Sequence, residues 1–127
     1  MKANELMIGD WVKTNDLYKA IKDVKVRAIS QYSIEDETTN QWVECQHIEP
    51  IPITAEILEK NGFRTFGLIN APKYGLWLND GRIIELSRID NGWRIWVFYN
   101  NIPMSLNYLH ELQHALRLCG ITHEIVL

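Results

Sequence analysis

The segment His110-Glu111-Leu112-Gln113-His114 is the part of the chain whose residue types and spacing could do chemistry. On a helix, its two histidines lie one turn apart and could both bind a zinc ion. Glu111 could then act as the general base for a water molecule whose pKa the metal has lowered. Read in this way, the motif would make the chain a small zinc-dependent metallopeptidase.

The helix that must carry this motif favours a different interpretation. We expect it from about Ser105 to Cys119, with the apolar residues on one stripe and His110 and His114 on the opposite side, facing solvent. Zinc also needs a third protein ligand, and after His114 the candidates are His123 and Glu124. His123 could lie level with His114, but its strand should join the sheet on the far side of the helix, and His47 could reach the motif only through tertiary folding. The apolar stripe consists of Leu106, Leu109, Leu112, Ala115, Leu116 and Cys119. We therefore predict no catalytic residue, no metal ligand and no cofactor, and keep His110, His114 and the base Glu111 as the alternative.

The first part of the chain is rich in short strand patterns. Strands are expected over 10–13, 18–21, 24–29 and 41–45, with a polar hairpin tip at 35–40. The segment Ile8-Gly9-Asp10-Trp11-Val12 resembles the opening of SH3-like and KOW-type barrels. These features predict an SH3-like curled sheet or partial barrel over residues 1–53.

The clearest local signal lies just after this region. Ile48–Ile53 is expected to be extended, because proline disfavours helix in the residue before it. Thr54 is a good N-cap for a helix over 55–61, and Gly62 with Phe63 is typical of a helix end. The sequence therefore predicts a short helix with both of its ends defined.

The remaining elements are a meander, a helix and a last strand. Strands are expected over 74–79, 82–89 and 93–99, joined at Asp80-Gly81 and Asn91-Gly92, and a final strand over 121–127. With the C-terminal helix packed on the meander, residues 54–127 form an α+β subdomain, and the whole chain is an α+β protein. The two parts are expected to form one compact unit.

The charge of the chain limits the classes of partner. Its 127 residues are 46% apolar and carry a net charge of −3, which argues against a dedicated nucleic-acid binder. A weaker hypothesis is a nucleic-acid module that uses basic residues of the N-terminal strands, namely Lys13, Lys19, Lys22, Lys25 and Arg27. The sequence contains no apolar stretch long enough to span a membrane and its start lacks the apolar core of a secretory signal, so we expect a cytoplasmic protein.

Three stretches carry a resemblance to a known group. They are Ala3–Leu6 with Ile8–Val12, then Ile51–Phe63, then Tyr108–Gln113 with Gly120 and Glu124. The chain resembles small uncharacterised bacterial proteins that are often encoded in prophages and other mobile elements. Members share a histidine, a leucine and a glutamine like His110, Leu112 and Gln113. The resemblance implies an accessory role in phage or mobile-element biology.

Together these observations predict a non-enzymatic accessory module that binds a macromolecule. The aromatic residues of the meander are the candidate contact residues: Trp77, Trp93, Trp96 and Tyr99. The negative net charge favours a protein over a nucleic acid as the partner.

Overall fold

The computed structural model describes residues 1–15, 21–97 and 100–127, and it forms two compact units. The first unit contains Met1–Pro52 and Tyr108–Ala115, and the second contains Ile53–Asn107 and Leu116–Leu127. Each unit has one five-stranded antiparallel sheet, so the chain is an α+β protein, as expected. The expected strand over 18–21 and the end of the one over 93–99 lie largely outside the described residues. Among the described residues, no helix is both long and apolar enough to cross a membrane.

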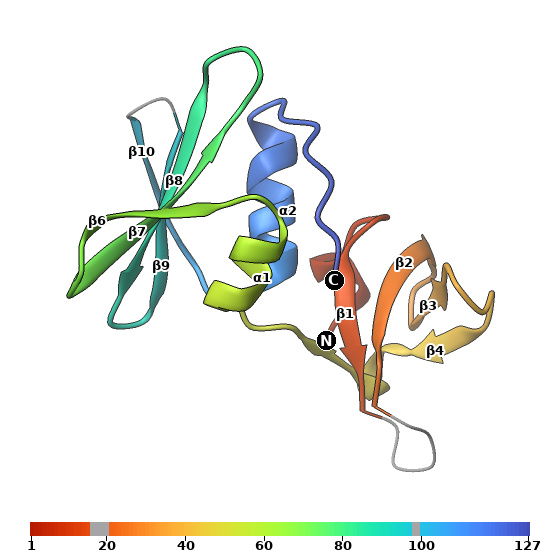
Figure 1. Ribbon diagram of the computed structural model, residues 1–127. Helices are drawn as coiled ribbons and strands as arrows, with labels where there is room; N and C mark the ends of the chain where they lie inside the picture. Colours follow the sequence, from red (N-terminus) through yellow and green to blue (C-terminus); the bar gives the residue numbers. More distant parts are fainter. Residues whose placement is uncertain (16–20, 98–99) are drawn as a thin grey trace. The chain divides into compact units, whose positions relative to one another are not determined.

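The sheet of the first unit follows the order β4-β3-β2-β1-β5 (Figure 1). Short 3-10 turns at Ala3–Glu5 and Cys45–His47 flank it. Its core contains Leu6, Val12, Val24, Val26, Ile34, Cys45 and Ile48. The strands are β1 (Trp11–Thr14), β2 (Asp23–Ile29), β3 (Ser33–Asp36), β4 (Trp42–Glu44) and β5 (Ile48–Pro50). The sequence had predicted β1, β2 and β4 to within a few residues, but not β3 or β5.

Asp36 explains why the polar segment after β3 forms a turn. Its buried carboxylate accepts hydrogen bonds from the Thr38 amide, the Thr39 hydroxyl and the Lys22 ammonium group, at 2.9 to 3.1 Å. Burial alone would raise the pKa of Asp36, but these bonds lower it overall. The carboxylate therefore stays ionised and fixes the hairpin.

The second unit contains the sheet β10-β9-β8-β7-β6 (Figure 1). One of its faces is buried and contributes Tyr74, Leu76, Ile84, Leu86, Trp93, Ile95 and Val97 to the core. The strands are β6 (Arg64–Leu68), β7 (Ala71–Trp77), β8 (Ile83–Ile89), β9 (Gly92–Val97) and β10 (Asn100–Leu106). The meander β7–β9 was predicted. β6 and β10 were not, and they extend the sheet on both sides.

The short helix α1 (Ala55–Lys60) has the ends that the sequence predicted. The hydroxyl of Thr54 accepts a hydrogen bond from the Ile57 amide at 3.2 Å, and Gly62 follows the helix with a φ of +89°. The amide of Phe63 then donates to the Leu58 carbonyl at 3.0 Å, which closes the C-terminal turn. Both termini of this helix are thus determined by local sequence.

Two predictions for the C-terminal part are wrong. Helix α2 covers Leu109–Leu118 and does not begin at Ser105, because Ser105 and Leu106 pair with β9 as part of β10. Residues 121–127 form no strand. Instead, the side-chain amide of Asn61 donates to the Val126 carbonyl at 2.8 Å and its oxygen accepts from the Val126 amide at 2.7 Å. One buried side chain therefore supplies the two bonds that a neighbouring strand would make.

Candidate functional site

The acidic residue of the His-Glu-x-x-His segment has a structural partner at the start of α2. Oε1 of Glu111 accepts a hydrogen bond from the backbone amide of Tyr108 at 3.0 Å. This amide is one of the groups that a helix N-terminus leaves without an intrahelical acceptor, and an acid in the first turn also suits the helix dipole. Glu111 thus acts as a capping residue, which is a sufficient reason for glutamate at this position.

His114 contacts a buried carboxylate of the first unit. Its Nε2 lies 2.6 Å from Oδ2 of Asp10, whose side chain is fully buried while that of His114 is 23% exposed. The same carboxylate oxygen accepts a hydrogen bond from the Met7 amide at 2.8 Å. Asp10 therefore links α2 to the turn that precedes β1.

Gln113, whose contacts no sequence pattern predicted, strengthens the same connection. Its side-chain amide donates to the Gly9 carbonyl at 2.9 Å, and its oxygen accepts from the Trp11 amide at 2.9 Å. Gln113 is buried, so the side chain that makes both bonds is itself largely shielded from water. Only the resemblance had drawn attention to this residue, as one of the three shared positions.

The expectation that both imidazoles face solvent is wrong. His110 is buried, stacks on Tyr108 with a centroid distance of 6.0 Å, and has its Nδ1 buried without a hydrogen-bond partner. His114 is only partly exposed because it faces Asp10. Four residues of the predicted apolar stripe, Leu109, Leu112, Ala115 and Leu116, lie in α2 and are buried, whereas Leu106 belongs to β10 and Cys119 follows the helix and is half-buried. However, the turn before β1 covers a further part of α2.

Burial sets the protonation state of His110. The loss of hydration lowers its pKa, the nearby charge of Asp10 raises it, and His114 lowers it further. Weaker effects of Glu111 and Glu5 raise it, and the net shift is downward from 6.5. His110 is therefore a neutral imidazole at pH 7.

The residues of the His-Glu-x-x-His segment have structural roles in the first unit. Over residues 1–15, 21–97 and 100–127, no three His, Cys, Asp or Glu side chains are arranged to bind a metal ion. Glu111 caps α2, His114 faces Asp10, and His110 packs on Tyr108. The arrangement thus serves to attach α2 to the first sheet.

Cys45 is the other group with nucleophilic potential in the first unit. It is buried next to an open hollow of about 470 Å³ lined by Met1, Lys2, Ala3, Asn4, Gln31, Tyr32 and Cys45 itself. Loss of hydration raises the pKa of the thiol, against a smaller lowering by the amino group of Met1. A thiol of raised pKa is a poor nucleophile.

The strongest candidate for a binding surface lies on the second unit. The solvent-side face of its sheet carries three aromatic and three basic side chains, which we call the aromatic–basic face: Arg64, Phe66, Lys73, Trp77, Arg94 and Trp96. The strand register places them on one side. Arg64 pairs with Gly75, Gly75 pairs with Glu85, and Glu85 pairs with Trp96. Trp77 remains 42% exposed and Trp96 is partly exposed.

The aromatic and basic side chains of this face contact one another. The guanidinium of Arg64 lies 5.1 Å from the Trp77 ring centre. Lys73 and Arg94 lie 6.0 and 5.9 Å from the Trp96 ring. Such cation–π contacts keep a cationic group over or close to each tryptophan ring. Trp77 and Trp96 were predicted contact residues, but Arg64 and Phe66 were missed because β6 was not foreseen.

Gly75 gives the face its local shape. A Cβ atom at this position would lie 2.7 Å from one ring atom of Trp77 and 2.9 Å from one of Phe66. The two rings, which meet edge to face at 5.6 Å, therefore lie directly over the glycine backbone. Trp93, also a predicted contact residue, is buried on the opposite face.

Comparisons with protein-family models, with curated proteins and with solved structures found no match for the chain.

Proposed function

We propose that the chain is a non-enzymatic binding module that contacts a macromolecule through the aromatic–basic face of its second unit. The observation that carries the proposal is the exposure of Trp77, with 42% of its surface accessible on a sheet whose other face contributes seven residues to the core. An exposed tryptophan flanked by arginine is typical of residues that dominate binding energies.

The contacts of the His-Glu-x-x-His segment support a binding role over a metallopeptidase role. The residues that could have formed a metallopeptidase site are engaged in capping and packing within the first unit. An accessory role in phage or mobile-element biology remains part of the proposal, and it rests on the sequence resemblance alone. A cytoplasmic location is proposed with it, on the composition of the sequence.

Site-specific photo-crosslinking in cells tests this proposal. A photoreactive phenylalanine analogue replaces Leu68, which is 71% exposed on the same side of β6 as Phe66, and in a control chain it replaces Tyr32, 73% exposed in the first unit. We expect macromolecular adducts from position 68 that are lost when Trp96 is changed to alanine, and none of these from position 32. Adducts that are equal at both positions, or that survive Trp96→Ala, would overturn the proposal.

A further inference from the structure

We infer that the occupant of the aromatic–basic face is a single strand of nucleic acid, whose bases stack on the Trp77 and Trp96 rings. This inference rests on the proposed function, because it names the partner of the same surface. It differs from the partner that the net charge of the whole chain favours.

The charge of the face itself carries the first part of the argument. Arg64, Lys73 and Arg94 are exposed there, and Glu85 is the acidic residue that the described strands place between them. The second unit as a whole has seven basic and six acidic residues, whereas the first has six and ten. The negative charge of the chain is thus concentrated in the first unit. Phosphate groups would meet a locally positive surface on the second.

The rings carry the second part of the argument. Single strands are bound by aromatic side chains on which bases stack, with basic side chains beside them for the phosphates. Trp77 with Phe66 forms one such centre, and Trp96 forms another. Gly75, beneath Trp77, pairs with Glu85, and Glu85 pairs with Trp96, so the positions of Gly75 and Trp96 are two strands apart in the sheet, or about 10 Å. Two or three nucleotides would span the face.

The close spacing of aromatic and basic side chains on this face also favours a single strand. Each tryptophan ring has a basic group within 6.0 Å of its centre. A base stacked on such a ring would bring its phosphate close to that basic group. A duplex cannot use this arrangement in the same way, because its bases are already stacked on one another.

Fluorescence anisotropy with labelled 12-mers tests the inference directly. The arms are oligo-dT, oligo-rU and a DNA duplex of equal length, each titrated with the full chain. We expect single strands to bind at least about tenfold more tightly than the duplex, with the two single-stranded arms showing which sugar is preferred. Three basic contacts predict a roughly eighteenfold loss of affinity between 50 and 200 mM salt.

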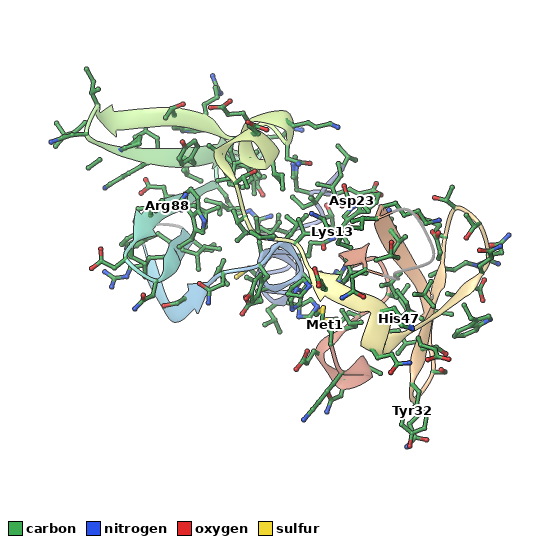
Figure 2. All side chains as sticks on the ribbon, turned by 90° about the horizontal axis from the view of Figure 1, so that it is seen from below. Met1, Lys13, Asp23, Tyr32, His47 and Arg88 are labelled. Carbon is green, nitrogen blue, oxygen red and sulfur yellow. The ribbon has the colours of Figure 1, made fainter. Side chains whose placement is uncertain are left out.

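Matched variants locate the site. Trp96→Ala should weaken single-strand binding by about five- to a hundredfold, and Arg94→Ala should lower both the affinity and its salt dependence. The controls are Trp42→Ala, a 51% exposed tryptophan of the first unit, and Arg88→Ala. Arg88 lies 5.3 Å from the Trp93 ring, on the other side of the same sheet, and is labelled in Figure 2. Neither control should change the affinity.

Three results would overturn the inference: no binding of any single strand at 50 mM salt, equal binding of the duplex, or equal losses in the control variants. Because Trp96→Ala could disturb folding, the charge reversal Arg94→Glu at an exposed position provides a second variant, with thermal unfolding as the check. Protein adducts from position 68 without oligonucleotide binding would leave the binding module in place and show that its partner is not a nucleic acid.

Discussion

Asp10 and His114 are separated by 104 positions in the chain, yet their side chains meet at 2.6 Å within the first unit. The carboxylate is fully buried and also accepts a hydrogen bond from the Met7 amide. The contact joins the turn before β1 to the middle of α2. It therefore connects the two chain segments from which this unit is built, Met1–Pro52 and Tyr108–Ala115.

A double-mutant cycle measures how strongly these two residues depend on each other. We expect Asp10→Asn and His114→Gln each to lower the free energy of unfolding, and the double variant to lose less than the sum. A coupling energy of about 0.5–3 kcal/mol is typical of residues in direct contact. Urea unfolding at pH 7 gives the four values, and strict additivity would contradict the contact.

Gln113 is expected to be among the most sensitive positions of the first unit. Gln113→Ala leaves the Gly9 carbonyl and the Trp11 amide without their side-chain partner, at a cost of about 2–4 kcal/mol. Gln46→Ala, at an exposed glutamine of the same unit, should change stability by less than about 0.5 kcal/mol. Chemical denaturation of both variants checks this. Equal losses would show that the Gln113 amide bonds contribute nothing.

His110 makes stability depend on pH. Its pKa is lowered in the folded chain, so on acidification the unfolded chain takes up the proton first. The folded state therefore loses stability as the pH falls below about 6.5. Above that pH His110 is neutral in both the folded and the unfolded chain, so it causes no loss of stability. In His110→Leu this part of the pH dependence should disappear. Unfolding free energies at pH 7 and pH 5 test it, and an unchanged difference between the two pH values would contradict it.

Asn61 should control the C-terminal segment of the second unit. Asn61→Ala removes both bonds to Val126, and we expect faster amide hydrogen exchange at Val126 together with a loss of about 2–4 kcal/mol. Thr122→Ala, at an exposed position of the same segment, is the control. Unchanged exchange at Val126 in the Asn61 variant would mean that other contacts hold the segment.

The zinc motif is expected to bind no stoichiometric metal. After expression with added zinc, the purified chain should contain less than about a tenth of an equivalent, since a stable site needs a third protein ligand. Elemental analysis gives the value. One equivalent that is lost in both His110→Ala and His114→Ala would restore the metallopeptidase interpretation.

The sequence was most informative where a structure depends on neighbouring residues. Helix α1 could be predicted with both ends because Thr54 and Gly62 act within one turn of it. The start of α2 could not, because Ser105 and Leu106 are drawn into a strand by pairing with β9. The burial of His110 likewise depends on a segment about a hundred residues away, and periodicity within a helix contains no information about such a neighbour.

In the candidate site, too, the residues within one predicted segment could be proposed from the sequence, whereas those brought in by strand pairing could not. Trp77 and Trp96 could be proposed as contact residues from the aromatic content of the meander. Arg64 and Phe66 join them only through the pairing of β6 with β7. The lysines and arginine proposed on the N-terminal strands lie partly outside the described residues. Of those described, Lys22, Lys25 and Arg27 form ion pairs with Asp36, Glu37 and Glu35.

The first unit is built from two segments that lie far apart in the sequence, and this has a consequence for its synthesis on the ribosome. Its residues 1–52 emerge early, but Gln113 and His114, which bond to Gly9 and Asp10, emerge only after the whole second sheet has been made. Domains usually fold as units in the order of their synthesis. Here the segment made first must wait without the bonds from Gln113 and His114 to its turn at Gly9 and Asp10, so the later-made sheet is free to fold before the first unit is complete.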